Sequence, residues 1–160
     1  MIIGYNRGKG GDFVAKPINQ SLNECLFFTV KKLDRILDKI AEEAFKPTGL
    51  SPTYGFIILA VNENPGITQK ELAELLHTAP STIARFVPKL EHKNLVYNEQ
   101  SGRNTLTYLT DEGVALAEQV KEAWDKLHHS FSEILGEKEH DELAIHIGEV
   151  GDQFKINNNH

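Results

Sequence analysis

The chain has 160 residues, of which 40% are hydrophobic and 25% are charged, and its formal net charge is −6. This composition is typical of a soluble globular protein, and the length corresponds to one domain with a sizeable core. No apolar run approaches the ~20 residues that a membrane-spanning helix requires, and the N-terminus lacks the apolar core of a signal peptide. The sequence therefore predicts a cytoplasmic protein with no membrane partner.

Residues 1–18 are predicted to form a flexible tail, and residues 19–160 a single domain. The tail contains four glycines among polar residues, but no strand precedes them and no Gly-Lys-Ser/Thr occurs. A phosphate-binding loop is therefore not supported. The domain should begin with a long helix over about residues 19–45, because apolar residues recur there every three or four positions, as in Leu22, Leu26, Val30, Leu33 and Leu37.

A second helix is predicted from Pro52 to Val61, with Ser51 as its N-cap. This helix is apolar on nearly all sides, so we expect it to be buried. A third helix should then begin in a capping box, in which the Thr68 hydroxyl accepts from the Glu71 N–H and the Glu71 carboxylate accepts from the N-cap N–H.

The fourth helix should begin at Thr78 as N-cap, with Pro80 in its first turn. At about 100° per residue its faces separate, and one face should join the core through Ile83, Phe86, Val87 and Leu90. The opposite face offers small hydroxyls and cations that suit base edges and phosphates: Ser81, Arg85, Lys89 and His92, with Thr82 on the flank. A solvated helix face with no ligand is the alternative.

Two short strands, 95–97 and 105–109, are predicted after this helix, joined by a loop over 99–104. Arg103 would lie at the tip of this hairpin, where it can contact phosphate or enter a minor groove. A helix-turn-helix followed by such a hairpin is a winged helix, which mainly places one helix in the major groove of DNA. Residues 78–103 carry four cations and two carboxylates, so their net charge is +2 within an acidic chain.

Two further helices are predicted over about residues 111–155, with Thr110 capping the first and Gly136 between them. Both carry long apolar stripes, as does the first helix of the domain. One short domain cannot bury three such stripes, so we expect a two-fold homodimer that reads two DNA half-sites about one turn apart. An intramolecular helical cap is the alternative.

The chain resembles the MarR family of winged-helix transcriptional regulators. Five segments carry the resemblance: Leu50-Ser51-Pro52, residues 69–73, 81–85 and 90–96, and Leu109-Thr110-Asp111-Glu112-Gly113. It implies a mainly α fold with a small β-wing, in which a winged helix-turn-helix over about 50–112 is flanked by dimerisation helices over about 19–45 and 111–155. It also implies a homodimeric regulator, expected to be a repressor, that binds double-stranded DNA at a palindromic operator.

Three positions depart from the pattern of this family. Ser101 stands where the family usually has an Asp that pairs with the wing Arg, and Asn94 stands where glycine is usual. Asn also tolerates the left-handed conformation that a helix C-cap requires. Pro88 lies inside the recognition helix and is expected to kink it or end it early, which would alter the aim of Lys89 and His92.

The resemblance also implies that a small molecule or an oxidant controls DNA binding. It places a pocket between the helical dimer region and the winged domain, for which Tyr54 and Phe56 are the candidate contacts to a small aromatic ligand. Core packing is the alternative for both. Cys25, the single cysteine, occupies a position similar to that of the peroxide-sensing cysteine in one branch of the family. A buried cysteine acting as a small hydrophobe is the alternative.

Metal, cofactor and enzyme sites are not predicted. His128 and His129 are adjacent and point about 100° apart on a helix, while Glu142 and His146 share a face but supply only two ligands. Hydrolase, zinc-protease and dinucleotide motifs do not occur. The sequence thus predicts a DNA-binding transcriptional regulator that is not an enzyme. A winged-helix protein-interaction module without DNA binding is the alternative function.

Overall fold

The computed structural model describes residues 17–158 and divides the chain into two compact units, Met1–Ile40 and Ala41–His160. Residues 1–16, where most of the flexible tail was predicted, lie outside the described residues. Among the described residues, no helix is both long enough and apolar enough to cross a membrane.

The first unit contains α1 (Ile18–Asn23) and most of α2 (Leu26–Phe45). The prediction of one continuous helix over this region is wrong, because the helix is interrupted at Glu24 and Cys25. At the break, the Asn23 carbonyl accepts a hydrogen bond from the Thr29 hydroxyl (3.3 Å). A side-chain hydroxyl thus bonds to the Asn23 carbonyl, which in an uninterrupted helix would accept a backbone N–H.

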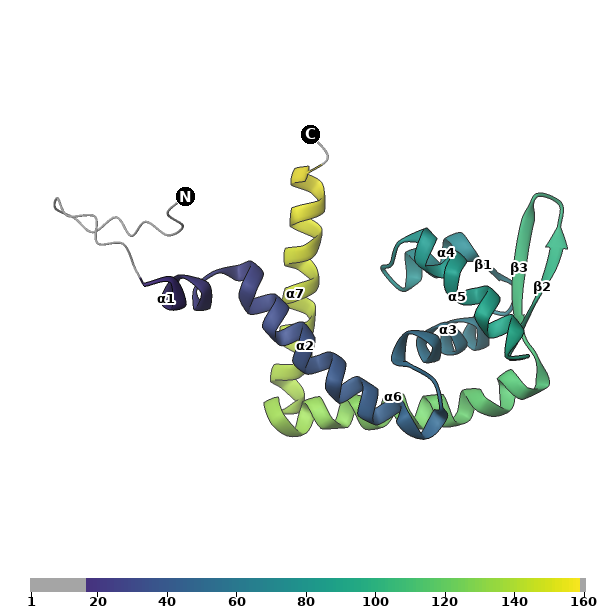
Figure 1. Ribbon diagram of the computed structural model, residues 1–160, viewed down its shortest axis with the longest axis horizontal. Helices are drawn as coiled ribbons and strands as arrows, with labels where there is room; N and C mark the ends of the chain where they lie inside the picture. The colour runs from purple at the N-terminus through teal and green to yellow at the C-terminus, as the bar shows by residue number, and fades with distance from the viewer. Residues whose placement is uncertain (1–16, 159–160) are drawn as a thin grey trace. The chain divides into compact units, whose positions relative to one another are not determined.

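The second unit begins at the end of α2 and continues through nine further elements (Figure 1). In chain order these are η1 (Lys46–Thr48), α3 (Pro52–Glu63), β1 (Ile67–Thr68), α4 (Gln69–Leu75), α5 (Pro80–His92), β2 (Val96–Ser101), β3 (Asn104–Leu109), α6 (Asp111–Leu135) and α7 (Glu137–Asn158). This order is the predicted mainly α fold with a small β-wing, which the structure confirms.

The sheet is antiparallel with the strand order β1-β3-β2. The sequence did not predict β1, whose two residues pair with Leu106 and Thr107 of β3. The wing strands are also longer than predicted, because Ser101 pairs with Asn104 across a turn that contains only Gly102 and Arg103. Gly102 has φ 60°, a conformation that glycine adopts without a steric penalty.

The core of the second unit lies between α3, α5, the sheet and α6. Its largest fully buried apolar side chains come from these layers and also from the end of α2 (Phe45) and from α4 (Leu72); the others are Ile57, Ile58, Val61, Ile83, Val87, Leu90, Val96 and Val120. The predicted burial of α3 is confirmed at Ile57 and Ile58. Gly55 is required where α3 approaches Phe45, because a Cβ at this position would lie 2.3 Å from the Phe45 ring.

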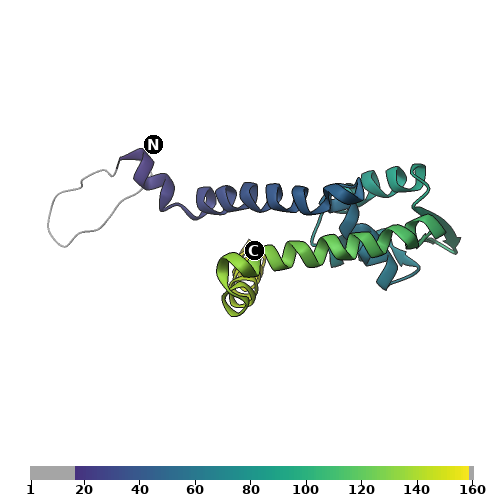
Figure 2. The same cartoon turned by 90° about the horizontal axis from the view of Figure 1, so that it is seen from below.

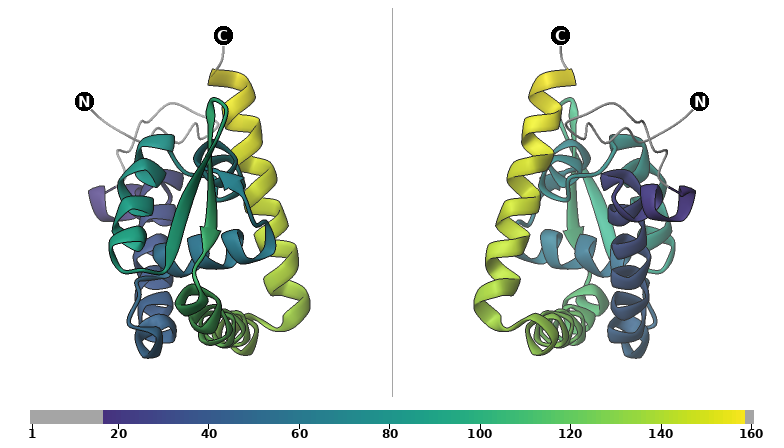
Figure 3. Two further views of the ribbon diagram at one scale, coloured as in Figure 1. Left: turned by 90° about the vertical axis from the view of Figure 1, so that its right-hand side faces the viewer. Right: turned by 90° about the vertical axis from the view of Figure 1, so that its left-hand side faces the viewer.

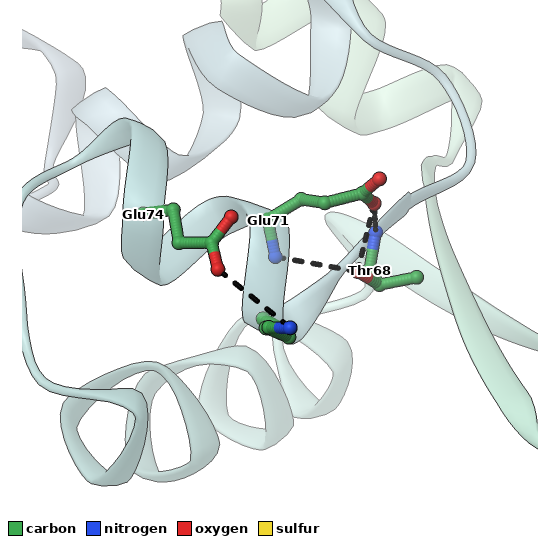
Figure 4. A network of polar contacts seen from close by, with 4 residues as sticks. Thr68, Glu71 and Glu74 are labelled. Atoms are coloured by element: carbon green, nitrogen blue, oxygen red, sulfur yellow. Dashed lines mark hydrogen bonds and ion pairs between the residues drawn. The ribbon is translucent and has the colours of Figure 1, made fainter.

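The helix starts in the second unit follow the local signals with one exception. The Thr68–Glu71 capping box is complete: the Glu71 N–H donates to Thr68 Oγ1 (3.3 Å), and the Thr68 N–H donates to the Glu71 carboxylate (2.9 Å) (Figure 4). Thr110 caps α6 as predicted. The predicted N-cap at Thr78 is wrong, because Ala79 takes this position and Pro80 follows as the first helical residue.

The helices α6 and α7 meet at Gly136, which has φ 87°. Figure 2 shows α6 from the side and α7 nearly end-on, so the chain turns sharply at this glycine. Large apolar side chains remain exposed along α7 as far as residue 156: Leu143, Ile145, Ile147, Phe154 and Ile156. In the first unit the same holds for Leu26, Phe27, Phe28, Val30, Leu33, Ile36 and Leu37 of α2.

Candidate nucleic-acid interface

The exposed face of α5 carries the residues that the sequence assigned to DNA. Ile83, Val87 and Leu90 are fully buried, which fixes the rotation of the helix about its axis. Four of the assigned side chains are consequently exposed and the fifth, Thr82, is half-buried; the exposed ones are Ser81, Arg85, Lys89 and His92.

Pro88 was expected to kink α5 or to end it early. The early end is contradicted, because α5 continues through Pro88 to His92. Pro88 is exposed, and the buried residues Val87 and Leu90 on either side of it anchor the helix to the core. The missing N–H removes one bond of the helical ladder. The last turn remains bonded, since the N–H of Leu95 donates to the Leu90 carbonyl (3.0 Å).

Phe86 was predicted to lie in the core, but it is only half-buried. Its ring instead lies close to two cations of α5, Arg85 and Lys89. Its ring is half-buried and packs edge-on against Tyr54 of α3, with 4.7 Å between the ring centroids. The Arg85 guanidinium lies 5.1 Å and the Lys89 ammonium 5.9 Å from the Phe86 centroid. A cation near an aromatic face at an exposed site gains about 0.5–1 kcal/mol. Tyr54 therefore contributes indirectly to the position of the cationic face.

Arg103 lies at the hairpin turn and is exposed, as predicted. Figure 3 shows the β2–β3 hairpin beside α5, so the hairpin and this helix belong to one side of the second unit. Among residues 17–158, no ion pair involves Arg85, Lys89 or Arg103. Their charges are therefore available to an anionic partner.

A set of hydrogen bonds joins the end of α5 to the start of α6 and so holds the wing in place. Asn94 has φ 59°, the left-handed conformation predicted for it. The Thr110 hydroxyl donates to the Asn94 carbonyl (2.6 Å) and accepts from the Gly113 N–H (3.0 Å). The Thr110 N–H donates to the Leu95 carbonyl (3.1 Å). A Cβ at residue 113 would lie 2.0 Å from the Leu95 oxygen, so only glycine fits there.

A cavity of about 730 Å³ lies between α3, α4 and α6. Phe56 lines it and meets Trp124 edge-on with 5.3 Å between the ring centroids. Tyr54 is not among its lining residues. The apolar part of the lining is Phe56, Leu59, Ala60, Leu75, Leu76, Ala117 and Trp124, and the polar part is Asn62, Glu63, Glu118, Lys121 and Asp125. Sequence reasoning missed the α6 side of this cavity, because its residues converge only in the folded unit.

Cys25 is half-buried and lies at the break between α1 and α2 in the first unit. Its assignment as an oxidant sensor stays a prediction. Cys25 directly precedes α2: its carbonyl accepts the N–H of Thr29 (3.0 Å), and its own N–H donates to the Leu22 carbonyl of α1 (3.2 Å).

Residues 50–105 match a model described as the MarR family. Over 83 residues the chain is 35% identical to a riboflavin kinase of Pyrococcus furiosus, which covers 52% of this chain and 33% of the kinase. Over 82 residues it is 32% identical to the HTH-type transcriptional regulator YybA of Bacillus subtilis, which covers 49% of this chain and 55% of YybA. The chain thus spans between one third and about half of the length of these relatives.

Solved structures extend the similarity to most of the chain. The repressor CouR bound to a 23-mer DNA duplex is 23% identical, has a TM-score of 0.73, and covers 81% of this chain and 94% of its own. CouR from Rhodococcus jostii RHA1 bound to p-coumaroyl-CoA is 25% identical, with a TM-score of 0.67 and coverage of 82% and 94%. Residues 50–105 therefore match the MarR family, and the fold of the described chain is similar to that of these solved repressors.

Proposed function

We propose that the protein is a homodimeric transcriptional repressor that binds a palindromic operator through α5 and the wing. The observation that carries the proposal is the exposed set of cations on α5 and the hairpin, none of which is neutralised by an ion pair among the described residues. A DNA-bound repressor of the same fold, CouR, supports it. Because the target would be chromosomal DNA, the proposal places the protein in the cytoplasm.

The residues of the α5 face would divide the contacts by their chemistry. Arg85 would lie against base edges, where its planar guanidinium can make a bidentate pair with guanine. Ser81 and Thr82, at the start of the helix, would approach a phosphate or a base with their hydroxyls. Lys89 and His92, near its end, would contact the phosphate backbone. Arg103 would reach the backbone or the minor groove from the wing.

Dimerisation is supported by the apolar side chains that remain exposed on α2 and α7. Leu33 is 38% exposed and Ile147 is 49% exposed, although both occur at helical spacing with other apolar residues. Contiguous exposed apolar surface of this kind marks an interface. A two-fold dimer would also double the number of phosphate contacts, which compensates for the small positive charge of each winged region.

The cavity between α3, α4 and α6 would hold the controlling small molecule. Its aromatic residues, Phe56 and Trp124, suit an aromatic ligand, as the sequence predicted for Phe56. Three carboxylates and one ammonium group, that of Lys121, line the cavity. This balance favours a neutral or cationic aromatic molecule over an anionic one. Such a ligand changes DNA binding only if it prefers one spacing of the recognition helices over another.

A gel-shift titration on the DNA upstream of the protein's own gene, repeated over a series of salt concentrations, tests the DNA-binding proposal. Arg85→Ala should weaken binding by about 1–3 kcal/mol if Arg85 contacts a base. Arg103→Ala should reduce the slope of log affinity against log salt by about 1. Lys89→Ala has a matched control in Lys126→Ala, which removes the same charge from an exposed position on α6.

Wild-type affinity in both arginine variants would contradict the proposal and favour a protein-interaction module. The likeness to a riboflavin kinase keeps that alternative concrete, since the similar 83-residue segment there forms part of an enzyme chain. The signal is tested separately: a panel of neutral, cationic and anionic aromatic compounds is screened for release of DNA, with Trp124→Ala as the cavity variant. Peroxide is compared on the wild type and Cys25→Ser, and an identical response in both would exclude thiol sensing.

A further inference from the structure

Two histidines and an aspartate converge at the corner between α6 and α7. His128 lies in the second half of α6, and His140 and Asp141 are the fourth and fifth residues of α7. One potential ligand atom from each of the three side chains lies within 4.8 Å of the others. The sequence predicted no such set, because His128 and His140 are brought together only when the chain turns at Gly136.

The side chains of this corner are held in position by contacts with one another. The rings of His128 and His140 meet edge-on, with 4.5 Å between their centroids. His140 also stacks on Phe131 with 6.1 Å between centroids, and its side chain is 15% exposed. The Nδ1 atom of His140 lies 3.0 Å from Asp141 Oδ1. Although neighbouring side chains on a helix usually point apart, these two ligand atoms are close enough to share an ion.

From this geometry we infer that His128, His140 and Asp141 form a binding site for a first-row transition-metal ion of the zinc type. Two imidazole nitrogens and one carboxylate oxygen are ligands that Zn²⁺ accepts in a tetrahedral site, with water in the fourth position. Ca²⁺ and Mg²⁺ prefer sets made only of oxygen atoms, so they do not match this site.

Only small side-chain movements separate the present arrangement from a coordinated one. With Zn–N and Zn–O distances of about 2.0–2.2 Å, the ligand atoms of a tetrahedral site lie about 3.4 Å apart. The ligand atoms now lie within 4.8 Å of one another, so they must approach to this shorter separation. The exposed side chains of His128 and Asp141 can rotate to do so, while the half-buried His140 stays fixed against Phe131. His140 thus serves as the anchor to which the two mobile ligands close.

An ion in this site would tie α7 to α6 across Gly136. The ion would add a coordinated link between two helices that turn at Gly136 (φ 87°) and already touch through the rings of His128, Phe131 and His140. An ion that binds the folded chain and not the unfolded one raises the melting temperature, and the rise grows with the logarithm of the free ion concentration once this exceeds the Kd. Because α7 carries exposed apolar residues, a bound ion would also restrict the orientation of this apolar surface relative to α6.

The test uses the full chain without a histidine tag, freed of metal by a chelator, and titrates it with Zn²⁺ in a calorimeter. We expect one ion per chain, and a loss of affinity of about tenfold or more in each of His128→Ala, His140→Ala and Asp141→Asn. His129→Ala is the matched control, since this neighbouring ring lies outside the cluster and pairs with Glu133 (3.3 Å). Its affinity for Zn²⁺ should equal that of the wild type.

Two further measurements separate coordination from a purely structural effect. Co²⁺, as a spectroscopic substitute, should give the visible absorption of a low-coordinate site in the wild type and in His129→Ala, and not in His140→Ala. Zn²⁺ should raise the melting temperature of the same two proteins and leave that of His140→Ala unchanged. Equal Zn²⁺ affinity in the wild type, His128→Ala and His140→Ala, or no binding to the wild type, would overturn the site.

Discussion

The winged region, residues 50–110, and the terminal helices, α2 and α7, carry apolar residues at the same helical spacing but bury them very differently. In α5 the residues Ile83, Val87 and Leu90 are completely buried. In α7, by contrast, Ile147 is 49% exposed and Phe154 is 54% exposed. Apolar periodicity thus identifies the face of a helix that needs a partner, but it does not tell whether the same chain supplies that partner.

The largest effect is expected where the start of α6 packs against the winged region. Gly113→Ala should lower the free energy of unfolding by about 3 kcal/mol, because the new methyl group overlaps the Leu95 carbonyl oxygen, which also accepts from Thr110. Urea denaturation followed by circular dichroism measures the change. An unaltered midpoint of the urea transition would show that the start of α6 can shift without loss of stability.

Gly148→Ala in α7 is the matched substitution in a terminal helix. A Cβ at residue 148 meets nothing within 4 Å, so the change should raise helix stability by about 0.5–1 kcal/mol through helix propensity alone. A destabilisation that disappears on dilution would instead show that another helix packs closely against this glycine. That result would sharpen the comparison by locating the partner surface on α7.

The next effect concerns assembly. Ile147→Glu places a carboxylate on the exposed apolar face of α7, and the proposed dimer should weaken by at least about 100-fold, which corresponds to about 2.7 kcal/mol. Light scattering during gel filtration should give half the mass of the wild type. His146→Glu adds the same carboxylate at the adjacent exposed position and should remain dimeric. A wild-type protein that elutes as a monomer at all concentrations would remove dimerisation from the proposal.

These contrasts also separate what the sequence could predict from what it could not. The Thr68–Glu71 box, the left-handed Asn94 and the Thr110 cap each depend on residues a few positions apart, and all three were predicted. Strand β1 has only two residues and exists because β3 offers it a partner, so no local pattern indicated it. The N-cap at Ala79 has no side-chain signal at all.

The candidate site divides in the same way. The exposed face of α5 followed from helical geometry, because Ile83, Val87 and Leu90 fix its rotation. The contact of Phe86 with Tyr54 and the α6 side of the cavity join residues more than 30 positions apart, and they required the folded unit. The length of the wing strands was missed because the polar residues of 99–101 were interpreted as loop, although a solvent-exposed hairpin accepts them.

A smaller effect is expected at Pro88, where the winged region departs from a local rule. Pro88→Ala supplies an N–H to the helical ladder of α5 and should raise the free energy of unfolding by about 1–2 kcal/mol, since the loss of a rigid residue from the unfolded chain offsets part of the gain. Thermal denaturation measures this. Operator affinity should stay unchanged, and a loss of affinity would show that the proline directs Lys89 and His92.

The smallest effect is expected at the capping box of α4. The Thr68 N–H, and then the Thr68 hydroxyl, hold the pKa of Glu71 below its ordinary value of 4.5. Because the folded state favours the ionised carboxylate, its contribution to stability is present above the unfolded-state pKa and is lost as the pH falls through the lowered folded-state value. Stability should therefore decline in acid, starting below about pH 5.

Glu71→Gln isolates the charge, because the amide oxygen can still accept from Thr68. Its melting temperature should be lower than that of the wild type at neutral pH, and the difference should close as the pH falls below 4.5. Glu74→Gln removes a charge from the same helix without touching the cap, since Glu74 lies 3.9 Å from Lys70 instead (Figure 4). If both variants lower the melting temperature by the same amount, the stabilisation comes from the net charge of α4 and not from the capping box.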